Sequence, residues 1–266
     1  TQAVAVEKIL QARSMSSFHA LWSVGAFSTT VLGGSVARIL SPQMNLGVVS
    51  VLCIAAFLPC VARLIPDELD GHQGENETTA KIALFGKSVT SLWFIGFGLL
   101  AALIAEGSAS DWGALLLRDD MGVGKGINAS AYASFALAMI TARFLGDRAL
   151  DHFGPARLVR MCGYFGAIGW AASIAIAVPL SDAHPLTALI IINLGFVIAG
   201  LAIGPMFPAF ILAASAIPGI APSVSSARAF VIGLSGFFIG PSMIGFLAEG
   251  TSISIAMGFP ILALLV

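Results

Sequence analysis

The stretch RFLGDRALDHFGPARLVR, residues Arg143 to Arg160, carries five basic and two acidic side chains between two runs that are almost uncharged. Those runs, about residues 127–146 and 158–180, are long enough to cross a lipid bilayer as helices. A Gly154-Pro155 pair interrupts the charged stretch, as glycine and proline do where a chain turns. The pattern predicts a membrane-spanning chain that turns here at the cytoplasmic surface, and we call residues 143–160 the elbow.

The composition of the whole chain also indicates a membrane protein. Hydrophobic residues make up 58% of the sequence and charged residues 10%, whereas soluble domains are about 25% charged. With a mean hydropathy of +0.95, a water-soluble fold would lack the polar side chains to cover its core. The net charge of −1, with no basic patch outside the elbow, argues against a nucleic-acid partner. We therefore expect an all-α helical bundle in the bilayer.

Eight segments have the length and apolar character of transmembrane helices. About 20 residues, at 1.5 Å per residue, cross the hydrocarbon layer. The uncharged stretch 185–227 is too long for one such helix, and Pro218, Gly219 and Pro222 divide it. The predicted spans are about residues 15–37, 43–63, 87–106, 127–146, 158–180, 185–214, 224–248 and 251 to the end.

A polar stretch and an internal repeat predict two membrane halves. Residues 66–83, PDELDGHQGENETTAKIA, are acidic and polar, as expected of a solvated linker. Residues 14–21, SMSSFHAL, resemble residues 223–230, SVSSARAF, and the two segments start spans that lie six helices apart, the period of parallel halves. The chain starts without methionine and ends in an apolar run, so we expect a fragment of a longer monomeric protein. We assign residues 1–64 to the end of a first six-helix half, 65–84 to a cytoplasmic linker and 85–266 to the second half.

The positions of lysine and arginine predict the orientation, because cytoplasmic loops are enriched in both. If residues 1–14 are cytoplasmic and the spans alternate, only Arg38, Arg118 and Lys125 fall outside. The other ten basic residues fall on the cytoplasmic side: Lys8, Arg13, Arg63, Lys81, Lys87, Arg143, Arg148, Arg157, Arg160 and Arg228.

With these features the chain resembles the major facilitator superfamily, whose members have twelve helices in two halves joined by a cytoplasmic loop. Residues 142–157 are similar to the family's cytoplasmic loop pattern, usually written G-x-x-x-D-R-x-G-R-R. Asp151, Gly154 and Arg157 match its acid, glycine and last base. The resemblance implies a multi-pass protein of a bacterial-type inner (plasma) membrane, with the bilayer, a small-molecule solute and protons as its partners.

The sequence departs from that loop pattern at two positions. His152 stands where arginine or lysine is usual, and Pro155 stands where a base is usual. An extra Asp147-Arg148 pair precedes Asp151 by one helical turn, so either acid can hold the functional position.

A second resemblance concerns the third predicted span. Residues 105–112, AEGSASDW, followed by residues 115–118, LLLR, are similar to a bacterial subgroup of permeases close to the fucose permease type. On this mapping the chain runs from the loop after the fourth helix of the family to part of the twelfth.

The two-half architecture also predicts a conformational latch at the elbow. The elbow would lie across the inner face from the start of the first full span, where unpaired backbone N–H groups carry partial positive charge and attract a carboxylate. A contact of Asp147 or Asp151 with that start would form only when the inner face is closed. Alternatively, the charges only fix the topology. The predicted latch residues are Arg13, Asp147, Arg148, Asp151, Gly154 and Arg157.

Glu106 and Asp111 are the acids closest to the membrane interior. The apolar pattern resumes after them, so the third span either continues to Arg118 and contains both acids or ends at Glu106 and leaves them in an outer loop. Ionisable groups inside a span usually face a water-filled cavity. Gly107 would suit a helix break of the kind that transporters place beside their substrate. We predict proton coupling or substrate contact for both acids.

Other polar and aromatic residues are candidates for a solute site. Trp112, Asn128 and Tyr132 could line a pocket in which aromatic faces stack on a sugar or an aromatic solute, although aromatics at this depth often serve packing. Asn193 is a lone amide in an apolar span, which favours either an interhelical hydrogen bond or substrate contact.

The sequence carries no enzyme signature. It has no G-x-S-x-G, no phosphate-binding loop and no metal-ligand spacing among its four histidines, so we expect no catalysis, cofactor, metal or direct use of ATP. We predict a secondary active transporter of a small organic solute that works by alternating access, as a proton-coupled sugar or polyol permease or as a drug or metabolite exporter. The alternative from another class is a membrane sensor, which binds solute without accumulating it.

Overall fold

The computed structural model describes residues 40–64 and 87–265, except 125 and 221, together with single positions between 9 and 28. The described ranges are helical and contain no strand. The chain divides into two compact units, residues 1–82 and 83–266. The predicted all-α fold class is confirmed.

In the first unit the structure describes one long helix, α3 (Pro42–Val61). Ser41 caps its start by accepting a hydrogen bond from the backbone N–H of Met44 at 3.3 Å, and Pro42 occupies the first turn, where a missing N–H costs nothing. The helix is apolar on every side, as a membrane-spanning helix is. It matches the predicted span at residues 43–63, while most of the span predicted at 15–37 lies outside the described residues.

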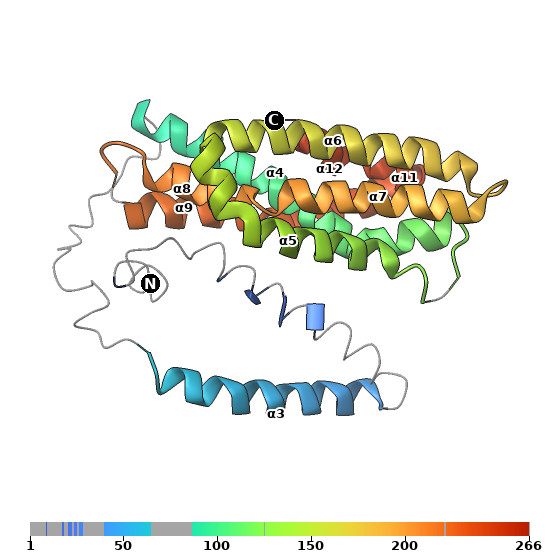
Figure 1. Ribbon diagram of the computed structural model, residues 1–266, viewed down its shortest axis with the longest axis horizontal. Helices are drawn as coiled ribbons and strands as arrows, with labels where there is room; N and C mark the ends of the chain where they lie inside the picture. The colour runs from blue at the N-terminus through green and yellow to red at the C-terminus, as the bar shows by residue number, and fades with distance from the viewer. Residues whose placement is uncertain are drawn as a thin grey trace. The chain divides into compact units, whose positions relative to one another are not determined.

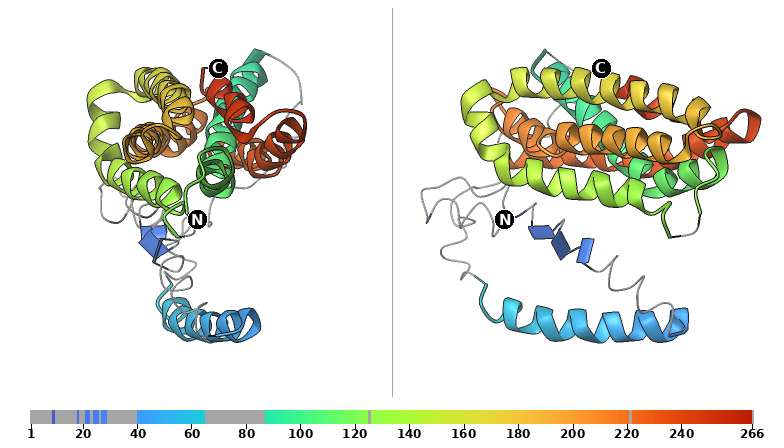
Figure 2. Two further views of the ribbon diagram at one scale, coloured as in Figure 1. Left: turned by 90° about the vertical axis from the view of Figure 1, so that its right-hand side faces the viewer. Right: turned by 45° about the vertical axis from the view of Figure 1, so that its right-hand side comes forward.

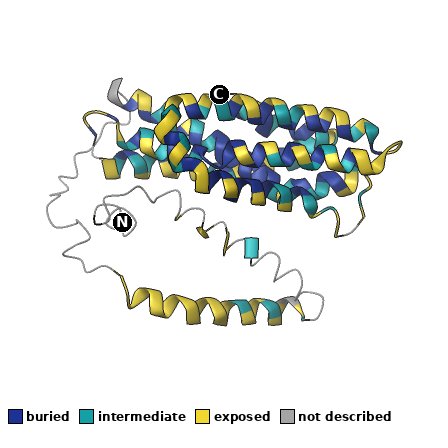
Figure 3. Cartoon of the chain, in the orientation of Figure 1, coloured by how far each residue is buried: buried dark blue, intermediate teal, exposed yellow. Residues whose placement is uncertain are grey.

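The second unit is a bundle of long helices that run roughly along one direction (Figure 1, Figure 2). Helix α7 packs on α5 and α6, and α4 packs on α9 and α10. Buried positions line the faces where the helices meet, and exposed apolar positions cover the outside (Figure 3). The elements are α4 (Lys87–Leu115), the π-helical turn η1 (Leu116–Asp120), α5 (Ser130–Phe153), α6 (Pro155–Leu180), α7 (Pro185–Ile203), α8 (Met206–Ser215), α9 (Pro222–Leu234), α10 (Gly236–Gly250), α11 (Ile253–Ala256) and α12 (Gly258–Ala263).

Among the described residues, five helical segments are long and apolar enough to cross a membrane: Gln43–Val61, Val89–Asp120, Pro155–Leu180, Pro185–Ser215 and Pro222–Gly250. Helix α5 has the length, at 24 residues, but is less apolar than these segments. One predicted boundary was wrong, because the span predicted at 127–146 extends to Phe153. The span predicted at 87–106 continues through Glu106 into η1, which agrees with the longer of its two predicted extents.

The predicted interruption at Pro218, Gly219 and Pro222 is confirmed, and a second break separates α7 from α8. Helix α7 ends before Gly204-Pro205 and α8 begins at Met206, because proline lacks the N–H that continues a helix. The chain turns between α8 and α9 with Gly219 at φ 81°, a conformation that favours glycine.

Small residues allow α10 to approach α4 closely. A methyl group at Gly236 would come within 2.7 Å of the carbonyl oxygen of Leu100, and one at Gly240 within 3.1 Å of that of Ile104. Small residues at a contact between two membrane helices allow their backbones to approach in this way. The two contacts lie one helical turn apart on α4.

Gly200→Ala is expected to destabilise the bundle more than an alanine at an open glycine. A methyl group at Gly200 of α7 would collide with the carbonyl oxygen of Phe135 in α5, and overpacking of this kind costs about 1–3 kcal/mol. Gly258→Ala is the matched control, because nothing lies within 4 Å of its added methyl group. Thermal unfolding in detergent measures both, and equal stability of the two variants would contradict the packing of α5 on α7.

Candidate functional site

A buried ion pair joins α4 to α5. Nη2 of Arg143 lies 3.2 Å from each carboxylate oxygen of Glu106 and donates to both. Arg143 is 3% exposed and Glu106 is 7% exposed. Arg143, which the sequence places at the start of the elbow, is therefore buried, and its assignment to the cytoplasmic side stays a prediction. Its helix runs on past it for nearly three turns, so Arg143 lies inside the bundle.

Both members of the pair lie far from the ends of their helices. Glu106 is near the middle of the 32-residue apolar segment Val89–Asp120, so at least about 20 Å of helix separates it from either end. Arg143 is near the middle of the 24-residue α5. On each side of Glu106 the segment is longer than half of a hydrocarbon layer about 30 Å thick, so a segment that crosses the layer carries Glu106 within it. A charge there is costly unless it is paired, which the two side chains achieve together.

Helix α4 is continuous around Glu106, and the break predicted at Gly107 is absent. Gly107 instead makes room for α10, since a methyl group there would lie 3.0 Å from the ring of Phe237. Ser108 satisfies its hydroxyl within the helix by donating to the carbonyl oxygen of Ile104 at 2.6 Å. Because α4 continues to Leu115, the alternative in which the span ends at Glu106 is excluded.

Tyr132 and Asp111 lie on the same two helices as the pair. Tyr132, on α5, is half-buried, and its ring stacks on Phe135 with centroids 6.4 Å apart. Asp111 is exposed on α4 and accepts a hydrogen bond from the hydroxyl of Ser110 at 2.9 Å.

Three other predicted residues do not join this group. Trp112 packs over Gly245 of α10 and against the apolar core. Asn128 ties the start of α5 to α4 by donating to the carbonyl oxygen of Ala114 at 3.3 Å. Asn193, on α7, accepts a hydrogen bond from Ser134 of α5 at 2.8 Å, which is the interhelical bond that was one of its two predicted roles.

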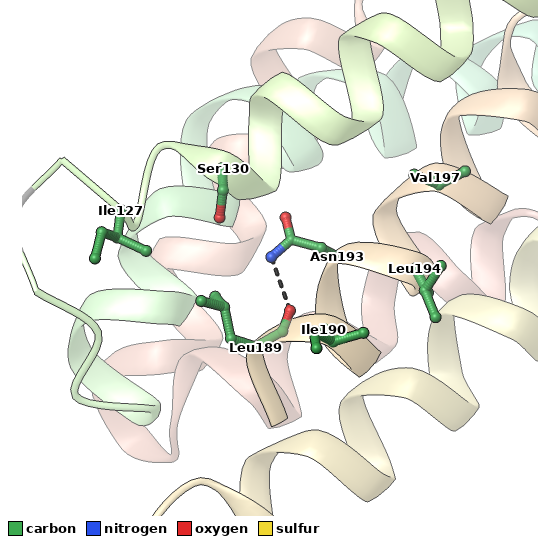
Figure 4. A pocket seen from close by; sticks show the side chains of 7 residues that line it. All are labelled: Ile127, Ser130, Leu189, Ile190, Asn193, Leu194 and Val197. Carbon is green, nitrogen blue, oxygen red and sulfur yellow. Dashed lines mark hydrogen bonds between the residues drawn. The ribbon is translucent and has the colours of Figure 1, made fainter. Parts of the chain in front are cut away.

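Asn193 also lines a cavity of about 330 Å³ between α5 and α7. The cavity is apolar except for the amide of Asn193 and the hydroxyl of Ser130 (Figure 4). That hydroxyl is buried and makes no hydrogen bond with the described residues. The cavity is open to the outside of the bundle, and Ile127, Ile190 and Leu194 of its lining are among the exposed apolar residues that cover that outside. The lining residues are Ile127, Ser130, Leu189, Ile190, Asn193, Leu194 and Val197.

Within the elbow, the chain makes a tight turn between two helices. Helix α5 ends at Phe153, Gly154 adopts φ 71°, and Pro155 starts α6. The guanidinium of Arg157 lies over the ring of Phe153 at 5.7 Å, which fastens one helix end to the other. The predicted latch partner Arg13 lies outside the described residues, so the latch stays a prediction. Asp147, Arg148 and Asp151 belong to the last turns of α5.

The sequence contains a signal for the Glu106–Arg143 pair. Arg143 falls inside the predicted span at residues 127–146, and Glu106 is the acid at the end of the span before it. Opposite charges in consecutive spans are candidates for pairing, because each is costly alone in the membrane. Ser134 carried no comparable signal as the partner of Asn193. In the described part of the chain, no group of three His, Cys, Asp or Glu side chains could hold a metal ion.

Comparison with known proteins gives consistent matches. Residues 6–241 match the family model described as Major Facilitator Superfamily. The chain is 31% identical to an uncharacterized MFS-type transporter of Yersinia pestis, over 99% of this chain and 64% of the relative. It is 27% identical to the uncharacterized transporter y4wD of Sinorhizobium fredii, over 93% of this chain and 62% of the relative. It is also 27% identical to membrane protein MosC of Rhizobium meliloti, over 97% of this chain and 59% of the relative.

The chain therefore spans less than two thirds of the length of these relatives. No solved structure matches it. None of the relatives' names refers to fucose, and the predicted resemblance to fucose permeases stays a prediction.

Proposed function

The chain belongs to the major facilitator superfamily, and we propose that the full-length protein is a secondary active transporter that moves a small organic solute by alternating access. The family and the apolar helices make it a multi-pass membrane protein. We place it in the inner membrane, with residues 65–84 as the linker between its halves.

The observation that carries the proposal is the buried Glu106–Arg143 pair. A charged pair inside a membrane bundle gives little net stability compared with apolar packing, because desolvation offsets its Coulomb attraction. Ionisable residues at this depth mark ion and proton pathways in membrane proteins. The pair joins α4 and α5 directly, so a change in its protonation acts on the packing of these two helices.

We propose that Glu106 carries the coupling proton. Arginine keeps its proton at all physiological pH values, so the carboxyl group is the member of the pair that can change charge. Protonation of Glu106 removes its negative charge and weakens its hold on Arg143. Release of the proton on the other side of the membrane restores the ion pair and resets the site.

Two classes of solute are compatible with proton coupling at Glu106. One is proton-driven uptake of a sugar or polyol, with Tyr132 and the half-buried Trp112 as aromatic contacts. The other is efflux of a drug or metabolite, for which the apolar cavity lined by Asn193 offers a surface.

A transport assay of the full-length protein in proteoliposomes against a solute panel tests the proposal. A solute should accumulate when a proton gradient is imposed and should only equilibrate when the gradient is collapsed. Binding without accumulation of any solute, in either direction, would instead indicate a membrane sensor.

Cysteine labelling with a membrane-impermeant reagent is expected to report a defined orientation. Cysteines at positions 120–124 should react from outside, and cysteines at 148–156 only from inside, because the basic residues of the elbow are retained in the cytoplasm. The opposite pattern in intact cells would refute the proposed topology.

A further inference from the structure

We propose that Asp147 is a second counter-ion of Arg143, which holds the guanidinium group when Glu106 takes up its proton. The inference rests on the proposed function, since it adds a positioning residue to proton coupling at Glu106. Asp147 acts through its negative charge and transfers no proton.

The burial of Arg143 creates the need for such a partner. Arginine stays positive at all physiological pH values, and Arg143 is 3% exposed. A buried charge that loses its partner is strongly destabilising, so protonation of Glu106 alone would be costly. A second negative charge within reach of the guanidinium removes that cost.

Asp147 lies on the same side of α5 as Arg143, one helical turn closer to Gly154. Side chains four residues apart on a helix share one face, with about 6 Å of rise between them. Along this face the side chains become more exposed turn by turn: Arg143 is buried, Asp147 is half-buried and Asp151 is exposed. Asp147 therefore lies between the buried pair and the surface, within reach of a long arginine side chain.

Other acids on α5 and on the helices packed against it are less well placed. These helices are α4, α6 and α7, and neither α6 nor α7 carries an acid. On α4, Asp111 follows Glu106 by five residues, which turns it by about 140° around the helix. It is exposed and accepts a hydrogen bond from Ser110. Asp151 lies two turns, about 12 Å, from Arg143 along α5.

Besides Arg143, no titratable side chain of the two described helices α5 and α6 is buried. Pairs between exposed charged groups contribute little, so the negative charge of Asp147 has its largest effect at Arg143. In addition to the two aspartates of α5, the half-buried or exposed groups are Tyr132, Arg148, His152, Arg157, Arg160, Cys162 and Tyr164.

A change of partner at Arg143 alters the contact between α4 and α5. Glu106 pairs with Arg143 across the two helices at 3.2 Å, whereas Asp147 is on the same helix as Arg143. A guanidinium held by Asp147 therefore no longer links α4 to α5, and no uncompensated charge remains in the bundle. An acid that follows its base along a helix forms the weaker of the two possible orientations, so Glu106 takes the guanidinium back when its proton leaves.

A double-mutant cycle between Asp147 and Glu106 tests this role. Glu106→Gln mimics the protonated acid. In that background Asp147→Asn leaves Arg143 without a counter-charge, so it should lower the folding equilibrium constant about tenfold more than it does in the parent. The constant is measured by denaturant unfolding of the full-length protein in detergent.

Two controls assign the effect to Arg143. When Arg143→Met is added to Glu106→Gln, no cation remains to be compensated, and Asp147→Asn should lose most of its cost. Asp119→Asn removes an exposed acid paired with Arg118 and should cost the same in every background.

Each result of the cycle decides the proposal. A double variant Glu106→Gln/Asp147→Asn that fails to fold, while both single variants fold, supports it. The proposal is overturned if Asp147→Asn costs the same with glutamate and with glutamine at position 106. It is also overturned if the extra cost survives Arg143→Met, or if Asp147→Asn alone prevents folding.

Transport measurements, at equal amounts of folded protein, separate failure of this inference from failure of the proposed function. Glu106→Gln should exchange solute, Asp147→Asn should slow that exchange, and Asp147→Glu, which keeps the charge, should preserve it. Exchange that Asp147→Asn leaves unchanged would refute the second counter-ion and keep proton coupling at Glu106. Full accumulation by Glu106→Gln would refute that coupling, while the unfolding cycle would still report whether Asp147 compensates Arg143.

Discussion

Glu106→Gln is expected to abolish accumulation of solute against its gradient while leaving exchange of solute across the membrane intact. Glutamine keeps the shape of the side chain and one oxygen that can accept from Arg143, but it cannot gain or lose a proton. Because glutamine cannot release a proton, the empty site cannot return across the membrane, and net transport stops. Exchange continues, because it needs only the loaded form of the site. Accumulation and exchange are measured with labelled solute in proteoliposomes.

The same assay contains its controls. Asp119→Asn removes an exposed acid that pairs with Arg118 at the end of the same segment and should leave both activities near the parent level. Glu106→Asp keeps a titratable group but withdraws it by one methylene, so accumulation should persist at a lower rate. Full accumulation by Glu106→Gln would exclude this residue as the proton carrier.

Arg143→Met is expected to lower the free energy of unfolding by about 3–5 kcal/mol, because it leaves the Glu106 carboxylate buried without its cation. Adding Glu106→Gln removes the uncompensated charge, so the double variant should recover much of the loss. A double-mutant cycle from unfolding in detergent measures this coupling directly.

The exposed pair Arg118–Asp119 is the matched comparison for that cycle. Its side chains are 52% and 42% exposed, and water screens their interaction. The corresponding variants, Arg118→Met and Asp119→Asn, should show little coupling. A buried pair that couples no more strongly than the exposed one would contradict the structure of the site.

The long apolar segments predicted most of the helices, because a chain that crosses a membrane must satisfy its backbone groups internally. Breaks at proline and glycine, such as Gly204-Pro205, were also predictable, since their cause is local. The ends of the helices were harder to predict. Helix α5 continues to Phe153 through residues whose charge suggested a loop, and this extension places Arg143 inside the bundle.

The candidate site was predictable in part. Glu106 stood out as an acid in an apolar segment, but the sequence does not show which face of the helix carries it or which neighbour faces it. The pairing with Arg143 depends on how α4 and α5 lie against each other. Gly107 illustrates the same limit: its sequence context suits a helix break, whereas contact with Phe237 of α10 explains it within a continuous helix.

Proton movement during transport tests most directly the claim that Glu106 carries the coupling proton. Full-length protein is reconstituted into vesicles that contain a pH-sensitive dye, and solute uptake is recorded together with the internal pH. We predict that solute entry acidifies the vesicle interior in the parent protein and that Glu106→Gln exchanges solute without any acidification. Solute accumulation by the parent without acidification, or acidification that persists in Glu106→Gln, would contradict the account.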